Sequence, residues 1–466
     1  MHHHLIWFRG DLRCGDNPAL DQALHGADRV SALYLQTPQQ DRQHHRGPRQ
    51  QAFIQANLQA LQEQLLRLGI ELHRLQAPDY TGAPAAIASL VEEQQVSQVF
   101  ANREPGVNEE RRDHAVARAI AAPLKRFNGD CVLKYGSVLS GKGEMFRVFT
   151  PFRTAWLNII RQRGYTCLAA PDDGATPDQG DRPAEKEQAF ADWPAGEQTA
   201  LARLDQFLQD GLEDYAEQRD FPGVAGTSGL SPYLAIGALS PRQCLQALQD
   251  HLGYLPMSPG ETGFAWLNEL VWREFYRHLM VAFPRVSMDR SFKPDMDALK
   301  WVDNSAHFDA WCNGMTGYPV VDAAMRCLNQ TGWMHNRLRM VVASFLTKDL
   351  QIDWRQGEHY FMQQLLDADF ASNNGGWQWA AGTGADAAPY FRIFNPTSQG
   401  EKFDRDGDFI RQWVPELASV PSKQLHQPQT WLDTHQPDHA YPPPVVDHAL
   451  ARKQTLARYQ RLKEQA

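Results

Sequence analysis

"LIWFRGDLRCGDNPAL", residues 5–20, sets the pattern that decides the fold of the N-terminal part of the chain. Its first four residues are apolar and of the length of a short strand. After a polar loop, Asp16 stands where a helix N-cap would accept backbone N–H groups, and Pro18 falls in the first helical turn. The stretch therefore predicts a strand, a loop and a helix in succession.

This succession repeats along the first part of the chain. The predicted strands are 5–8, 30–35, 70–75, 96–102 and 130–135, and the predicted helices are 18–25, 49–68, 83–93 and 109–120. Gly69 is expected to end the second helix. Alternating strands and helices indicate an α/β domain with a doubly wound parallel sheet, over residues 1–131. The chain has no GxGxxG after a strand and no GxxxxGK[ST], so the usual phosphate-binding loops are absent from its sequence.

The remainder of the chain has a different character. Residues 170–200 are rich in Pro, Gly and acidic residues, so we expect residues 132–200 to form an interdomain linker. From residue 201 to residue 466 apolar residues recur with the period of a helix. This part is predicted to be a second, all-α domain.

Composition narrows the class of protein. The net charge of −9 argues against a protein that coats nucleic acid, but it leaves room for a local basic groove. The six cysteines form no CxxC pair, which indicates reduced thiols in a cytoplasmic protein and no cysteine-based metal site. No apolar run approaches the length of a membrane span.

The stretch "DADFASNNGGWQWA", residues 367–380, concentrates acids, amides, glycines and indoles. No His and no third acid stands at ligand spacing, so a site for a hard cation is disfavoured. Asp367 and Asp369 could instead pair with Arg337 or Arg339 of "HNRLRM", or read the edge of a heteroaromatic ring. Helix caps and a core ion pair remain the alternative explanation.

Two further stretches carry candidate binding groups. "TSGLSPYLAIGALSP", residues 227–241, places hydroxyls and glycine before a helix, which suits either an anion site or a capping turn. On "WLNELVWREFYRH", residues 266–278, Trp266, Glu269, Trp272 and Arg273 fall on or near one helical face. An acid among Trp residues on such a helix is costly unless it faces a cleft. A Glu at the solvent edge is the simpler alternative.

Together these stretches resemble the photolyase/cryptochrome family. The resemblance runs from "HLIWFRGDLRCGDNPAL" (4–20) to "NPTSQGEKFDRDGDFIRQW" (395–413), and its longest motifs span residues 316–350 and 353–396. The chain looks most similar to class I cyclobutane pyrimidine dimer photolyases. That likeness implies an antenna chromophore on the α/β domain and FAD on the helical domain, which also holds a pocket for a flipped lesion.

The resemblance also implies roles for individual residues. The positions implied to bind FAD are Tyr215, Thr227, Ser228, Gly229, Leu230, Ser231, Trp266, Arg273, Arg339, Asp367, Asp369 and Asn373. Asn373 corresponds to the residue beside flavin N5, where a neutral amide suits an anionic reduced flavin better than a carboxylate would. Trp377, Trp354 and Trp301, in that order outward, correspond to an electron-transfer chain. The lesion and DNA positions are Glu269, Trp272, Asn336, Met340, Trp379, Arg219, Arg337 and Lys402.

The activity implied is light-driven repair of dimers in UV-damaged DNA, by electron transfer from excited FADH⁻ to an extruded dimer, with Glu269 and Asn373 at the reaction centre. His44, Asn108 and Glu109 correspond to an antenna site for 5,10-methenyltetrahydrofolate. Met288 stands where the family has Lys, and Gly229 where related enzymes often have Arg, so folate affinity and one contact near the cofactor or DNA are open. A deazaflavin, another flavin or an empty site are the alternatives for the antenna. A monomer is expected.

Three alternatives within this reading remain. (6-4) photolyases carry His where this chain has Asn336 and Met340. Cryptochromes, which signal without repair, often replace the Asn at N5. A light-independent flavoprotein would have no need of Glu269 and Met340 beside a cleft.

Overall fold

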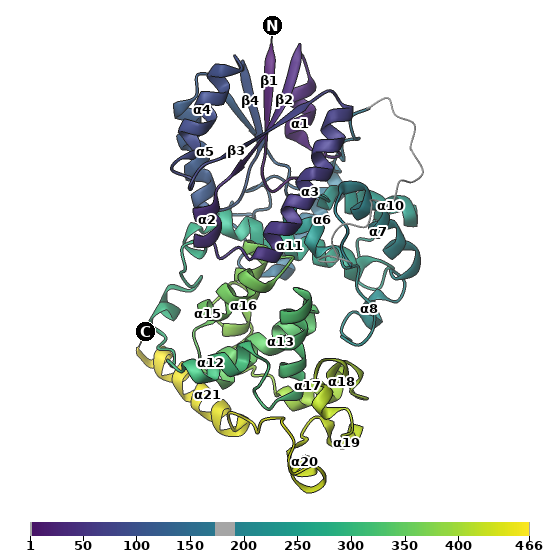
Figure 1. Ribbon diagram of the computed structural model, residues 1–466, viewed down its shortest axis with the longest axis vertical. Coiled ribbons are helices and arrows are strands. Elements are labelled where there is room, and N and C mark those ends of the chain that lie inside the picture. The colour runs from purple at the N-terminus through teal and green to yellow at the C-terminus, as the bar shows by residue number, and fades with distance from the viewer. Residues whose placement is uncertain (1, 173–191, 466) are drawn as a thin grey trace. The chain divides into compact units, whose positions relative to one another are not determined.

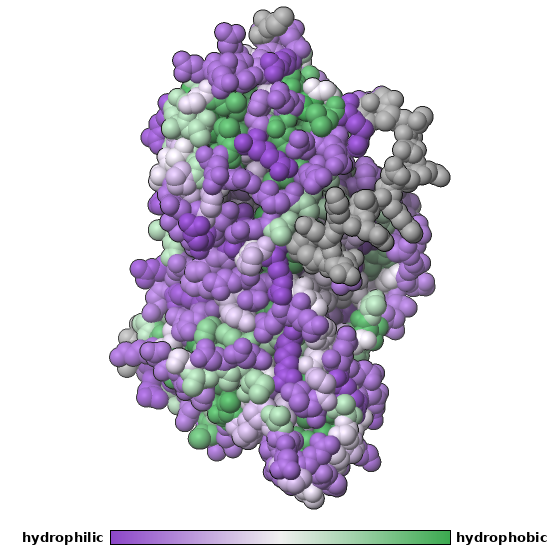
Figure 2. All heavy atoms as spheres, viewed as in Figure 1, coloured by the Kyte–Doolittle hydropathy of each residue, from purple (hydrophilic) through white to green (hydrophobic). Residues whose placement is uncertain are grey.

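The computed structural model describes residues 2–172 and 192–465, and it divides them into two compact units. Unit 1 comprises residues 1–213 and 228–284, and unit 2 comprises residues 214–227 and 285–466. Among the described residues, no helix is long and apolar enough to cross a membrane. Hydrophilic residues cover most of the face shown in Figure 2.

Unit 1 contains a parallel sheet of five strands in the order β3-β2-β1-β4-β5. The strands are β1 (His3–Phe8), β2 (Arg29–Gln36), β3 (Glu71–Gln76), β4 (Gln98–Asn102) and β5 (Leu124–Phe127). Figure 1 shows α1 (Pro18–Leu24) and α3 (Pro48–Arg67) on one face of the sheet and α4 (Ala83–Glu93) and α5 (Val107–Ala119) on the other. The predicted doubly wound α/β fold is confirmed, and its topological switch point lies between β1 and β4.

The predicted strand at 130–135 is wrong, because the fifth strand is Leu124–Phe127. The amides of Val132 and Leu133 donate instead to the carboxylate of Glu274, at 2.9 Å each. A side chain far along the sequence thus takes the N–H groups that a sheet would have used.

The N-cap of α1 also differs from the prediction. Asn17, not Asp16, accepts the N–H of Leu20. Asp16 is fully buried with a φ of 46°, and its carboxylate binds Ser240 and Arg242. Gly69 does follow the end of α3 with a φ of 70°, a backbone conformation that favours glycine.

Unit 1 also contains α2 (Pro38–Gln43) of the predicted N-terminal domain and α6 (Phe149–Arg163) of the predicted linker. Its further helices are α7 (Glu197–Asp210), α9 (Ser231–Ile236), α10 (Pro241–Leu252) and α11 (Phe264–Ala282). The predicted linker, 132–200, therefore includes α6, which packs against α11. Its residues 173–191 lie outside the described part of the chain. The predicted domain limits stay a prediction.

The described residues of unit 2 are helical and contain no strand, as predicted for the C-terminal part. Its helices are α8 (Tyr215–Gln218), α12 (Ser305–Cys312), α13 (Pro319–Thr331), α14 (Asn336–Ser344), α15 (Trp354–Gln364), α16 (Phe370–Ala381), α17 (Pro396–Phe403), α18 (Asp408–Trp413), α19 (Ser422–Leu425), α20 (Gln429–His435) and α21 (His448–Gln465). One apolar core joins residues of α12 to α16 with α18. The six cysteines of the chain are free thiols.

Candidate functional site

The stretch 367–380 forms α16 and the turn before it. Asp369 is the N-cap of α16 and accepts the N–H of Ser372 at 2.8 Å. Asp367 is buried in the preceding turn. Arg339 Nη2 donates hydrogen bonds to both of its carboxylate oxygens, at 3.0 Å to Oδ1 and 2.8 Å to Oδ2. The ion pair predicted between α14 and this stretch is therefore present, with Arg339 as its cation.

Arg337, the other candidate cation, points elsewhere. It pairs with Asp220 at 2.7 Å, and its guanidinium lies 4.4 Å from the centre of the Phe403 ring. Lys402 Nζ also lies over that ring, at 4.9 Å. Arg337 and Lys402 thus both contact the Phe403 ring, and their role as a basic patch for DNA stays a prediction.

Two adjacent side-chain amides on α16 donate hydrogen bonds to one residue of α15, Glu358. Asn373 Nδ2 donates to the backbone carbonyl of Glu358 at 3.0 Å, and Asn374 Nδ2 donates to Glu358 Oε1 at 2.9 Å. Gln378 Nε2 donates in turn to Asn374 Oδ1 at 2.9 Å. Since the Asn373 nitrogen is engaged, its carbonyl oxygen is the group left to accept a hydrogen bond from a ligand.

Glu358 is fully buried, and burial raises the pKa of its carboxyl to about 7. Its Oε2 has no hydrogen-bond partner among residues 2–172 and 192–465. Sequence reasoning missed this residue, because "RQGEHY" reads as the polar face of an ordinary helix.

The three predicted electron-transfer tryptophans belong to one core. Trp377 and Trp354 are buried in the unit 2 core, and half-buried Trp301 packs against it. Trp377 lies close to Gly357, where an added Cβ would come 2.1 Å from the indole ring. The indole N–H groups of Trp377 and Trp354 have no partner within the described residues. Trp301 is the most exposed of the three, and the order of electron transfer among them stays a prediction.

Sequence reasoning did not single out Trp311, whose ring centre lies 6.0 Å from that of Trp377. Trp311 is fully buried, and its indole N–H donates to the carbonyl of Val342 at 3.1 Å. No local signal in the sequence separates this residue from the other tryptophans.

The remaining predicted residues of unit 2 are placed as follows. Asn336 and Met340 stand one turn apart on α14, exposed and half-buried. Half-buried Trp379 lies 6.3 Å from Phe394 between ring centres. Arg219 lies 5.3 Å over the ring of buried Tyr215. Thr227 is half-buried at the end of its segment.

In unit 1, α11 carries the second predicted group. Trp266 is buried against Phe207, with 5.3 Å between ring centres. Trp272 stacks on Phe149, with 3.6 Å between ring centres. Glu269, which lies between Trp266 and Trp272 in the sequence, is half-buried. Arg273 binds the carboxylate and carbonyl of Asp130, so its guanidinium is anchored at a fixed place on the helix.

The predicted anion site at 227–231 lies against the guanidinium of Arg203. The carbonyl of Ser228 accepts Arg203 Nε at 3.2 Å, and that of Gly229 accepts Trp193 Nε1 at 2.9 Å. Gly229 has a φ of 61°, and an added Cβ would lie 2.4 Å from Arg203 Nη2. The Arg203 guanidinium thus fills the space beside position 229. Leu230 is buried, and exposed Ser231 begins α9 with no side-chain cap.

The three predicted antenna residues lie close together in unit 1, with one hydrogen bond among them. His44 Nε2 lies 3.2 Å from Asn108 Nδ2, and His44 Nδ1 lies 3.7 Å from Glu109 Oε1. Tyr80, which was not predicted, donates its hydroxyl to Glu109 at 3.1 Å. The structure therefore brings these side chains together from α5 and the end of α2.

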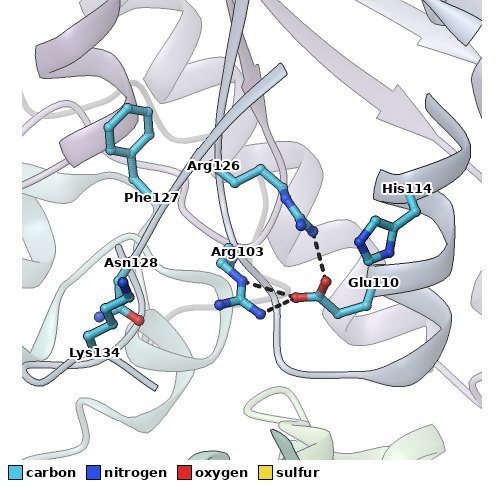
Figure 3. A pocket seen from close by; sticks show the side chains of 7 residues that line it. All are labelled: Arg103, Glu110, His114, Arg126, Phe127, Asn128 and Lys134. Carbon is cyan, nitrogen blue, oxygen red and sulfur yellow. Dashed lines mark hydrogen bonds and ion pairs between the residues drawn. The ribbon is translucent and has the colours of Figure 1, made fainter. Parts of the chain in front are cut away.

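A separate hollow of about 500 Å³ lies at the carboxyl ends of β4 and β5 (Figure 3). Arg103 and Arg126 both bind the carboxylate of Glu110 there, at 2.6 and 2.8 Å, with His114 beside it. Although burial raises it, hydrogen bonds from the two arginines hold the pKa of Glu110 below its ordinary value. Phe127, Asn128 and Lys134 line the other side.

Known proteins resemble this chain over its whole length. Deoxyribodipyrimidine photo-lyase of Escherichia coli is 49% identical, with 98% of each chain covered, and that of Vibrio cholerae is 46% identical, with 98% and 99% covered. The chain belongs to the DNA photolyase family. The family model described as "DNA photolyase" matches residues 4–172, and "FAD binding domain of DNA photolyase" matches residues 266–461.

Solved structures of family members share the fold of this photolyase-family chain. A class III photolyase from Agrobacterium tumefaciens superposes with a TM-score of 0.85 at 36% identity, covering 100% of this chain and 98% of the other. A cryptochrome from Synechocystis gives 0.85 at 29% identity, covering 98% and 99%. The fold alone therefore does not separate photolyases from cryptochromes.

The residues of this family member fit a flavin. An isoalloxazine ring is aromatic and has a polar edge of N–H and C=O groups, and α14 to α16 offer one carboxylate–guanidinium pair and an amide with a free acceptor. The buried Trp377 indole, whose N–H has no partner in the described part of the chain, adds a polar, polarisable neighbour in the same core. Charged and polar groups buried in this way are usually retained for a ligand or for chemistry.

Proposed function

We propose that this protein is a light-driven DNA repair enzyme that splits cyclobutane pyrimidine dimers at bound FAD. The observation that carries the proposal is the Asn373 amide, whose nitrogen is fixed by the Glu358 carbonyl at 3.0 Å. An acceptor oxygen at that place binds the N5–H of fully reduced, anionic flavin without adding a negative charge. The full-length similarity to photo-lyases supports the same function.

The flavin is held from several segments. Arg339 and Asp367 bind the polar edge of the ring, and their ion pair keeps both groups in one orientation. Phosphate and sugar contacts come from Tyr215, Thr227, Ser228, Leu230 and Ser231, and further ring or ribityl contacts from Gly229, Trp266, Arg273 and Asp369. Trp377, Trp354 and Trp301 pass electrons inward when the bound flavin is oxidised, and the last of them is the half-buried one.

When bound in its reduced form, FAD supplies one electron to the dimer under light and recovers it after the ring has split. The residues of the chain position the lesion for that transfer. Trp272 and Trp379 offer indole faces for stacking, Glu269 and Asn336 offer hydrogen bonds to base edges, and Met340 offers apolar contact. A damaged, poorly stacked dimer costs less to extrude than a normal pair.

The DNA backbone is bound by Arg219, Arg337 and Lys402. Arg337 is paired with Asp220 at 2.7 Å, so a phosphate must share or replace that carboxylate. Such contacts fix register and make affinity depend on salt without reading sequence. The enzyme acts as a monomer in the cytoplasm, and sedimentation with and without DNA tests the first of these.

The test is repair itself. Reduced, FAD-loaded protein is mixed with an oligonucleotide that carries one thymine dimer, and the return of thymine absorbance is followed in blue light and in darkness. Recovery in light alone is the expected result. Absence of recovery, with FAD bound and reduced, would contradict repair and favour a cryptochrome-type photoreceptor.

A folate antenna is proposed for the group of His44, Asn108 and Glu109. A carboxylate that already accepts the Tyr80 hydroxyl can also accept N–H groups of a pterin ring. Glu109→Ala is expected to lower the 5,10-methenyltetrahydrofolate recovered with the protein, whereas Glu93→Ala, on the exposed face of α4, leaves it unchanged. Recovery of a deazaflavin or a second flavin instead would contradict the folate assignment.

A further inference from the structure

Glu358 is an acid that the proposed reaction has not yet used. It lies on α15 and is fully buried, and it accepts hydrogen bonds from two side-chain amides of α16. Gly357, the preceding residue, faces the Trp377 ring so closely that a Cβ there would lie 2.1 Å from it. One turn of α15 therefore borders both the Asn373 amide and the innermost tryptophan.

A chain of titratable groups leads from Glu358 to the surface of unit 2. One ligand atom each of Glu358, His359 and Asp289 lies within 4.8 Å of the others. His359 is about one-third exposed and Asp289 about two-thirds exposed, with 3.9 Å between His359 Nε2 and Asp289 Oδ1. Such a series of carboxyl and imidazole groups is suited to carry protons between water and a buried acid.

Burial favours the protonated form of Glu358, against the hydrogen bond from Asn374 and most of the neighbouring charges. Arg355 and His359 of its own helix lower the pKa, Asp289 raises it, and the facing groups of α16, Asn374 and Gln378, are uncharged. Burial is the largest of these influences and raises the pKa to about 7. The carboxyl therefore holds a proton near neutral pH, and its Oε2 has no partner among the described residues.

We propose that Glu358 is the proton donor to the flavin site during light-driven reduction, refilled from water through His359 and Asp289. This rests on the proposed function, since it needs bound FAD and the tryptophan relay. Full reduction of bound FAD to the anionic FADH⁻ takes two electrons and one proton: the electrons arrive one at a time through Trp377, and Glu358 gives the proton. An added thiol reductant replaces the electrons through Trp301 and Trp354, and water replaces the proton.

The account separates proton delivery from electron delivery. Glu358→Gln keeps the shape and the hydrogen bond to Asn374 but has no acidic proton. Asp349→Asn is the matched control, because Asp349 is another buried acid of unit 2 with a raised pKa, of about 6, and its partner is His448. His359→Gln interrupts the route between Glu358 and Asp289.

The experiment follows light-driven reduction of FAD-loaded protein with a thiol, by transient absorption in H₂O and D₂O from pH 5.5 to 9. In the native protein, proton uptake is expected to slow above about pH 7 and in D₂O. Glu358→Gln is expected to slow proton uptake by about a hundredfold, whereas the rate of electron transfer to the flavin stays unchanged. His359→Gln slows the second turnover, and Asp349→Asn behaves as the native protein. Native proton-uptake kinetics in Glu358→Gln would overturn the proposal.

A second measurement needs no light and no repair. Because the folded protein binds the Glu358 proton more tightly than the unfolded chain, its free energy of unfolding falls as pH rises from about 4.5 to 7. Glu358→Gln is expected to remove that fall, and an unchanged pH profile would show Glu358 ionised and exclude it as donor. Loss of dimer repair by chemically reduced native protein, with these results intact, would contradict the proposed function alone.

Discussion

Two regions of the molecule bury charged or polar side chains: the contact of residues 130–135 with α11, and the contact between α15 and α16. They differ in whether these side chains have hydrogen-bond partners. In the first, Asp130 binds Arg273 and Arg277, and the Glu274 carboxylate accepts two backbone amides and the indole of Trp156. In the second, Trp354 Nε1, Trp377 Nε1 and Glu358 Oε2 have no partner among the described residues.

The difference shows what each region is for. Although burial raises it, Arg273 and Arg277 hold the pKa of Asp130 well below its ordinary value, and a satisfied network of this kind fixes local structure. A buried polar atom without a partner costs about 1–3 kcal/mol. Three such atoms on α15 and α16 carry a free-energy cost that no contact among the described residues offsets, which is expected where a cofactor or chemistry uses the groups.

The largest effect is expected at the outer end of the tryptophan series. Trp301→Phe replaces an oxidisable indole by a ring that cannot be oxidised, so light-driven reduction of bound FAD falls to background. Dimer repair by chemically reduced protein is retained, because that reaction bypasses the series. Trp413→Phe, a partly buried tryptophan against the same core, is the control. Loss of both reactions in Trp301→Phe would place this residue outside an electron-transfer role.

Glu274→Ala tests the satisfied region. It leaves three N–H groups unpaired, the buried Trp156 indole and two partly buried backbone amides, so the free energy of unfolding is expected to drop by about 3–5 kcal/mol in urea denaturation. Glu261→Ala removes an exposed Glu that also accepts backbone N–H groups, and it should cost less than about 1 kcal/mol. Equal costs for the two variants would remove the contrast between the regions.

A smaller effect is expected at Glu269, which is half-buried on α11. Loss of a hydrogen bond between this carboxylate and the dimer costs about 1.5–3 kcal/mol, so Glu269→Ala should lower repair roughly tenfold or more while FAD stays bound. Flavin absorbance and repair yield are measured on one sample. A native yield would exclude Glu269 from the reaction.

The smallest effect concerns Gly229. Its φ of 61° and the nearby Arg203 guanidinium make Gly229→Ala destabilising by about 1 kcal/mol. Gly141→Ala, with open space around it and no positive φ, should change stability little. Thermal unfolding of both variants compares them, and equal midpoints would show that Arg203 does not need the space.

The sequence predicted what local patterns determine. The bounds of α4, the presence of the first four strands and an ion pair between Asp367 and an arginine of α14 follow from periodicity and from the rule that buried charges pair. The strand at 130–135 and the Asp16 cap failed because Glu274 and Ser240, distant in sequence, capture those groups. Glu358 was missed because its burial depends on how α16 packs over α15.

The most direct test compares two tryptophans of one core whose ring centres are 6.0 Å apart. The Trp311 N–H is bonded to Val342, whereas the Trp377 N–H has no partner in the described chain. Transient absorption of FAD-loaded protein is recorded for Trp377→Phe and Trp311→Phe. We expect the first substitution to abolish light-driven flavin reduction and the second to leave it. Loss in Trp311→Phe with reduction intact in Trp377→Phe would contradict the account.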